Sequence, residues 1–138
     1  MGVLVLPTPV RDDLFTHARV GAPAEVCGVL GGTREEATVR VETSVRVPNV
    51  AAAPEWRYEL DPEAQLRAMR TVEERGLDVV GFYHSHPEGP RRPSATDEAQ
   101  ATWPGASYVI VALGGGDPFV GSWRWTGGSF EEERVRVE

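Results

Sequence analysis

The residues best suited to chemistry are two histidines and an aspartate close together in the sequence. His84 and His86 are separated by one residue, and Asp97 follows within the same short stretch. The apolar segment 78–83 precedes them and predicts a buried strand. Because residues i and i+2 of a strand project from the same face, His84 and His86 would present two imidazoles where the strand ends.

The residues after the proline- and arginine-rich loop predict the start of a helix. Ser94 suits the N-cap position, which places Asp97 at the third helical position. A strand end and a helix start would thus bring His84, His86 and Asp97 to one point. Three protein ligands with a fourth position left for water are typical of a catalytic zinc site.

Each of these parts also has an interpretation without metal chemistry. Ser94 and Asp97 fit a variant of the capping box, and His84 and His86 could be a hydrogen-bonded pair at a sheet end. Taken separately, these plainer interpretations are favoured. The chain has only three histidines, however, and two of them fall in one triplet at a strand terminus, so together the residues favour a metal site.

A single glutamate lies inside the apolar segment 23–32. Burying Glu25 among such neighbours is costly unless another group pairs with it, which suggests a functional role. The alternative is a glutamate at the exposed mouth of the segment. Cys27 is expected to be a small core residue, with a role in lining the site left open. His17 is expected to be a surface or half-buried histidine rather than a ligand.

Composition limits the classes of function. The chain has 138 residues and a net charge of -7, which argues for one domain and against binding to nucleic acid or anionic membranes. All 14 basic residues are arginine, so P-loop and Schiff-base chemistry are excluded. No stretch resembles a signal peptide or could span a bilayer, and we expect a cytoplasmic protein.

The order of elements predicts an α/β fold. Helices are expected from Thr8 to before Gly21, from Asp61 to Gly76 with Leu66, Met69 and Val72 inward, and briefly after Ser94. Strands are expected at 3–6, 37–47, 56–60, 78–83, 107–113, 119–125 and 130–137. Together they predict an α/β sandwich, in which a mixed sheet of roughly six to eight strands carries two helices and a third short helix lies at the site.

The chemistry-bearing residues resemble a known motif. Glu25, followed by the spacing H-[ST]-H-x7-S-x2-D over residues 84–97, resembles the JAMM (MPN+, Mov34) motif of zinc isopeptidases. Segment 23–31 resembles the compact archaeal and bacterial, desampylase-like members. The resemblance covers essentially the whole chain and implies a single metalloprotease domain over 1–138. The implied fold is the MPN, cytidine-deaminase-like fold, a three-layer-like sandwich with a mixed sheet flanked by helices.

The resemblance also implies roles for individual residues. It implies that His84, His86 and Asp97 bind one Zn²⁺. Glu25 would be the general base acting on the zinc-bound water, whose pKa zinc lowers to about 7. Ser94 would help to hold the oxyanion of the tetrahedral intermediate.

The implied reaction is hydrolysis of the (iso)peptide bond after the C-terminal Gly-Gly of a ubiquitin-like modifier. The thin, extended tail is expected to lie as an added strand beside the strand that carries the histidines. Arg91 and Arg92 either grip the modifier's carboxylates or tail carbonyls, or simply form a solvated basic loop.

Three other functions remain open at this point. The first is a peptidase that trims a cysteine or short peptide from a sulfur-carrier protein, using the same site. The second is a non-catalytic MPN binding module, which the complete ligand set disfavours. The third is a RadC-like DNA-associated protein, disfavoured by Ser85 between the histidines, where RadC-type sequences carry asparagine, and by the acidic charge. The oligomeric state, monomer or homodimer, is also open.

Overall fold

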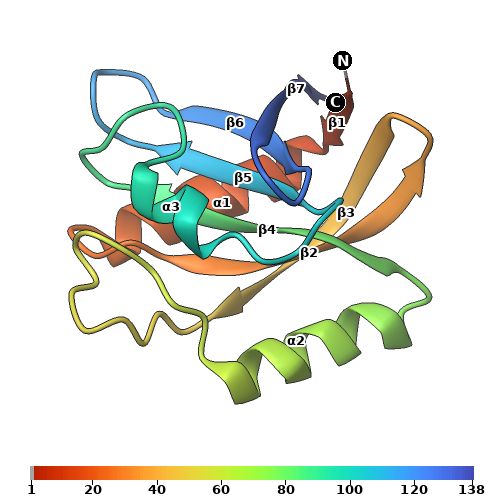
Figure 1. The fold of residues 1–138 in the computed structure, drawn as a ribbon, viewed down its shortest axis with the longest axis horizontal. Helices are drawn as coiled ribbons and strands as arrows, with labels where there is room; N and C mark the ends of the chain where they lie inside the picture. Colours follow the sequence, from red (N-terminus) through yellow and green to blue (C-terminus); the bar gives the residue numbers. More distant parts are fainter. Residues whose placement is uncertain (1) are drawn as a thin grey trace.

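The computed structural model describes residues 2–138, which form seven strands and three helices. Figure 1 shows their arrangement. The elements are β1 (Val3–Leu6), α1 (Thr8–Gly21), β2 (Cys27–Glu35), β3 (Thr38–Val47), α2 (Pro62–Glu74), β4 (Asp78–His86), α3 (Ala95–Gln100), β5 (Ser107–Ala112), β6 (Phe119–Trp125) and β7 (Phe130–Val137).

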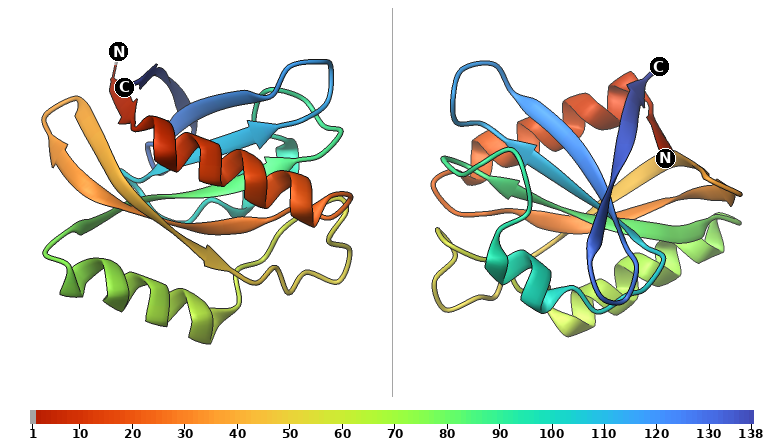
Figure 2. Two further views of the ribbon diagram at one scale, coloured as in Figure 1. Left: turned by 180° about the vertical axis from the view of Figure 1, so that it is seen from behind. Right: turned by 45° about the horizontal axis from the view of Figure 1, so that its top comes forward.

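The strands form one mixed sheet in the order β1-β3-β2-β4-β5-β6-β7, which closes because β7 also pairs with β1. Helix α1 lies across one face of the curled sheet and α2 covers another part (Figure 2). Leu14 of α1 packs in one buried cluster, and Val72 of α2 packs in a second. The predicted α/β class, with a mixed sheet flanked by helices, is confirmed. Closure of the sheet into a barrel was not predicted.

Two local predictions are wrong. Segment 56–60 alternates like a strand, but only Leu60 pairs there, in an isolated bridge to Asn49. Leu66 is 48% exposed, whereas Ala68 and Val72 of the same helix are buried. Residues four apart share a helix face, so the face that carries Ala68 and Val72 leaves Leu66 toward solvent.

Strand β4 lies in the interior of the sheet and carries the two histidines. It pairs antiparallel with β2, up to the partners Cys27 and His84, and parallel with β5, up to His86 and Ala112. Both edges of β4 are therefore occupied. The expectation that a substrate tail adds as a strand directly beside β4 is wrong for this reason.

The connection from β4 to β5 positions the third candidate ligand. Neighbouring parallel strands require a crossover that returns the chain to the other end of the sheet. Here the crossover spans residues 87–106 and contains α3. Helix α3 comes early in this crossover, and its first turn lies beside the end of β4, as Figure 1 shows.

Within residues 2–138, none of the helices combines the length and the apolar character that crossing a bilayer requires.

Gly81 permits the close pairing of β4 with β5, so the stability of the protein should depend on it. A Cβ on Gly81 would collide with the backbone oxygen of Ser107. Gly81→Ala should therefore lower the free energy of unfolding by about 1–3 kcal/mol, measured by urea denaturation. Gly128→Ala is the matched control, because a Cβ there meets no atom within 4 Å. Equal stability of the two variants would contradict this account of the strand pair.

Candidate metal centre

Four buried side chains meet at the end of β4. One ligand atom from each of Glu25, His84, His86 and Asp97 lies within 4.8 Å of all the others. Each of the four residues is at most 6% exposed. The imidazole centroids of His84 and His86 lie 5.0 Å apart, as expected for two residues on one face of a strand. The residues that the sequence singled out are thus brought together.

A single oxygen of Asp97 is the meeting point of this cluster. Asp97 Oδ2 lies 2.9 Å from His86 Nε2 and 3.0 Å from His84 Nε2. The same oxygen accepts the Ser94 backbone N–H at 2.9 Å, and Ser94 Oγ accepts the Asp97 N–H at 3.0 Å. The capping box and the cluster are therefore two functions of the same carboxylate. Although burial opposes ionisation, the contacts with His84, His86 and Ser94 hold the pKa of Asp97 well below its usual range.

The loop after β4 fixes the protonation of one histidine. His86 Nδ1 lies 2.8 Å from the Pro90 carbonyl, which can only accept, so Nδ1 carries hydrogen. In a neutral ring the lone pair of Nε2 then faces the carboxylate of Asp97. Two acceptors at such a distance need a cation between them, either a proton or a metal ion. A carbonyl on the far nitrogen is also the usual support of a metal-binding histidine.

Two buried atoms of the cluster are unsatisfied. Within residues 2–138, Glu25 Oε1 has no hydrogen-bond partner, and His84 Nε2 lies 3.0 Å from Asp97 Oδ2 without the geometry of a hydrogen bond. Burial lowers the pKa of His84 and thus favours the neutral imidazole that a metal requires. Burial also raises the pKa of Glu25 to about 7. Unsatisfied buried groups are costly, and a bound cation with its water would satisfy both. The residues present therefore fit a metal ion.

The backbone around Glu25 is fixed by contacts from distant segments. Ser85 Oγ accepts the N–H of Val26 at 2.8 Å, and the Ser85 N–H donates to the Val26 carbonyl at 3.0 Å. Asn49 Nδ2 donates to the Glu25 carbonyl at 2.9 Å, and the Glu25 N–H donates to Pro54 at 2.7 Å. These bonds hold Glu25 opposite the ligands.

Tyr58 covers one face of a candidate ligand. Its ring stacks on His84 with centroids 4.2 Å apart and an interplanar angle of 19°. Asn49 holds the segment that carries Tyr58, because its Nδ2 donates to the Arg57 carbonyl and its Oδ1 accepts the Glu59 N–H. Sequence reasoning missed Asn49, Ser85 and Tyr58 as supports of the site. Of the three, only Ser85 could have been suspected of a supporting role from the sequence, because it lies between the two histidines.

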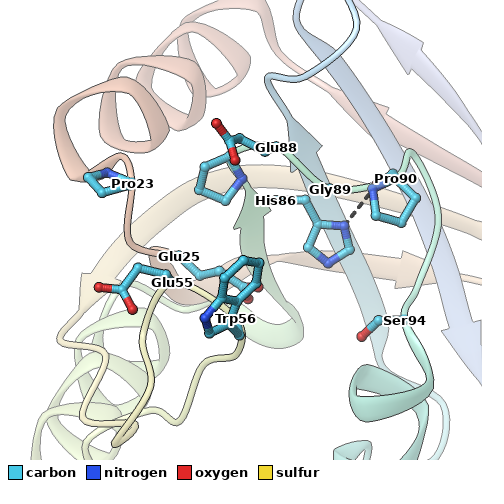
Figure 3. Close-up of a pocket in the computed structure, with 10 residues that line it drawn as sticks. Pro23, Glu25, Glu55, Trp56, His86, Glu88, Gly89, Pro90 and Ser94 are labelled. Carbon is cyan, nitrogen blue, oxygen red and sulfur yellow. Dashed lines mark hydrogen bonds between the residues drawn. The ribbon is translucent and has the colours of Figure 1, made fainter.

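One cavity borders the cluster, and a second is linked to it through Tyr58, which stacks on His84. One, of about 450 Å³, is lined by Glu25, His86 and Ser94 together with Pro23, Glu55, Trp56, Pro87, Glu88, Gly89 and Pro90 (Figure 3); we call it the Glu25 cavity. The other, of about 520 Å³, is lined by Arg57, Tyr58, Glu59, Leu60, Gln65, Phe82, Gln100, Thr102 and Tyr108; we call it the Tyr58 cavity.

The remaining candidate residues lie outside the cluster. Arg91 donates to the Asp117 carbonyl at 2.9 Å and lies over the Phe119 ring. Arg92 is exposed, and neither arginine lines either of the two cavities. His17 bonds to the Tyr83 hydroxyl, and burial lowers its pKa to about 4. Cys27 is fully buried, and burial raises the pKa of its thiol to about 12, which makes it a core residue rather than a nucleophile.

Comparison with known proteins places these features in a family. Residues 7–126 match the family described as prokaryotic homologs of the JAB domain. The chain belongs to this family. The expected JAMM/MPN-type membership is thereby confirmed, and the matched residues include all four members of the cluster.

Several named relatives of this JAB-domain chain are enzymes. It is 46% identical to a desampylase of Haloferax volcanii, over 98% of this chain and 96% of the relative. It is 37% identical to a probable TtuB-protein conjugate cleaving protease of Thermus thermophilus, over 82% and 72%. It is 36% identical to a CysO-cysteine peptidase of Mycobacterium tuberculosis, over 98% and 91%.

A solved structure shares the fold of this JAB domain. The solution structure of a protein from Desulfitobacterium hafniense aligns with a TM-score of 0.88 at 32% identity, covering 98% of this chain and 92% of that one.

The stacked tyrosine of this JAB domain generates a prediction about metal binding. Tyr58→Ala should lower zinc affinity about tenfold, because His84 loses the ring that orients it. Tyr58→Phe retains the stacking face and should bind zinc like the parent. The measurement is competition with a chromogenic chelator. If Tyr58→Ala binds zinc as tightly as Tyr58→Phe, the orienting role is wrong.

Proposed function

We propose that this chain is a zinc metalloprotease that hydrolyses the (iso)peptide bond after the C-terminal Gly-Gly of a ubiquitin-like modifier. The observation that carries the proposal is the buried carboxylate of Glu25, left unsatisfied beside two histidines and an aspartate. The named relatives, a desampylase among them, support the same reaction class. We propose further that residues 1–138 act as one domain in the cytoplasm, with modifier conjugates rather than nucleic acid or membranes as partners.

In this proposal His84, His86 and Asp97 hold one zinc ion. Their donor set of two imidazole nitrogens and one carboxylate oxygen is that of a catalytic site, which keeps one position open. Zinc bound there would lower the pKa of a water molecule to about 7 and polarise the scissile carbonyl. The capping box around Asp97 and the Pro90 carbonyl on His86 keep these ligands oriented.

Glu25 is the proton carrier of the mechanism. Burial raises the pKa of its carboxyl group, and a raised carboxyl pKa suits a group that both takes and gives a proton. Its carboxylate takes the proton of the attacking water, and the resulting acid gives that proton to the departing amine nitrogen. Glu25 lines the same cavity as His86 and Ser94, so these groups face one substrate.

Ser94 stabilises the negative charge that develops on the carbonyl oxygen. Its Oγ accepts the Asp97 N–H, so its own hydroxyl hydrogen is free to donate into the Glu25 cavity. One such donor, held in place before the reaction, is typical of an oxyanion hole.

The modifier's tail has an available backbone edge next to the site. The Arg57 carbonyl and both backbone groups of Glu59 are engaged by Asn49 and Val50. The backbone groups of Tyr58 have no such bond in the described chain. An extended Gly-Gly tail could pair with Tyr58 along the Tyr58 cavity. We therefore place the tail beside Tyr58 rather than beside β4, whose two edges are already paired.

Substitutions distinguish the proton carrier Glu25 from the metal ligand Asp97. Glu25→Gln should retain one zinc per chain but lose cleavage, because the proton carrier is removed and the ligands stay. Asp97→Ala should lose both zinc and activity, because it removes a ligand. Zinc content is measured by mass spectrometry of the metal, and cleavage on modifier conjugates. Active Glu25→Gln, or full zinc content in Asp97→Ala, would contradict the assigned roles.

A further inference from the structure

We propose that the Glu25 cavity receives the amine side of the scissile bond and selects a lysine whose neighbours in the target protein are basic. This inference rests on the proposed function and extends it to the choice of target. A buried carboxylate lines this cavity, and the charged side chains around its mouth are acidic.

The side on which the amine departs follows from the proton carrier. The acid that protonates the leaving nitrogen must lie within hydrogen-bond reach of it. Glu25 is 6% exposed, its Oε1 has no partner within residues 2–138, and it lines the Glu25 cavity together with Ser94. The Tyr58 cavity does not include Glu25. The leaving nitrogen and the side chain attached to it therefore occupy the Glu25 cavity.

The walls of the Glu25 cavity suit the aliphatic part of a lysine. Pro23, Pro87 and Pro90 line it with apolar rings, and Trp56 stands at its side with 75% of its surface exposed (Figure 3). The lysine side chain carries four methylene groups before its nitrogen, and such stems pack along apolar surfaces. The exposed face of Trp56 also attracts cationic groups.

The charges around the cavity are of one sign. Glu55 and Glu88 line it and are exposed, and neither forms an ion pair with any residue from 2 to 138. None of the residues lining it is an arginine, and its one histidine, His86, is a metal ligand in the proposed function. Arg91, on the adjacent loop, is engaged with Asp117 and Phe119. The cavity mouth therefore attracts lysine or arginine neighbours of the target and repels carboxylates.

The same charges separate two kinds of leaving group. A lysine ε-amine in a basic segment brings positive charge to Glu55 and Glu88. A C-terminal cysteine joined through its α-amine brings its own free carboxylate close to the leaving nitrogen. The Glu25 cavity therefore favours the lysine ε-amine as leaving group and disfavours the C-terminal cysteine.

The test uses three conjugates of one Gly-Gly-ending modifier with the zinc-loaded protein. In the first, the modifier is joined to a lysine flanked by arginines, and in the second to a lysine flanked by glutamates. In the third, it is joined to a C-terminal cysteine. We expect kcat/KM for the arginine-flanked conjugate to exceed that for the glutamate-flanked one by about fivefold, since exposed ion pairs are individually weak. The difference should shrink as salt is added.

Variants assign this preference to the cavity. The double variant Glu55→Gln, Glu88→Gln should cleave the first two conjugates at similar rates and should gain activity toward the cysteine conjugate. Glu74→Gln removes the same kind of charge at the last turn of α2 and should keep the preference of the parent. Free arginine-flanked peptide should also inhibit the parent more strongly than free glutamate-flanked peptide, a readout that needs no turnover of that peptide.

The outcomes separate this inference from the function on which it rests. If none of the conjugates is cleaved, the proposed function is wrong. If they are cleaved without preference, or if the preference survives in the double variant, the proposed function stands and this inference is wrong. A parent that favours the cysteine conjugate would also overturn it and would indicate a sulfur-carrier peptidase.

Discussion

The site depends on a pair of hydrogen bonds between Ser85 and Val26. The backbone of Ser85 donates to the Val26 carbonyl, and its hydroxyl accepts the Val26 N–H. Ser85 is flanked by His84 and His86, whereas Val26 follows Glu25. These two hydrogen bonds thus set where the carboxylate of Glu25 lies relative to both imidazoles. A change of register between β2 and β4 would move the carboxylate away from the imidazoles.

The local parts of the site were predictable from the sequence. Alternation along a strand is sufficient to place His84 and His86 on one face. Capping preferences are sufficient to place Asp97 in the first turn of α3, with its carboxylate directed back at the strand end. In both cases the residues that determine the geometry are close neighbours in the chain, so the local sequence pattern predicts that geometry.

The long-range parts were not predictable by the same reasoning. Asn49 ties Glu25 to the segment of Tyr58 through its side-chain amide, and a single asparagine in a loop carries no signal of such a role. Segment 56–60 has the alternation of a strand but finds only one bridge, because pairing depends on a partner elsewhere in the chain. Closure of the barrel through β1 and β7 joins segments more than a hundred residues apart, which periodicity does not address.

The shared oxygen of Asp97 has a thermodynamic consequence. Helix α3 has six residues, too few to persist alone in water, so its order depends on the capping box and on packing. A cation held by Asp97 Oδ2 would bind only when that turn is formed, and binding to the folded form alone shifts the folding equilibrium by mass action. The melting temperature of the chain would then serve as a gauge of how much of the protein carries its metal.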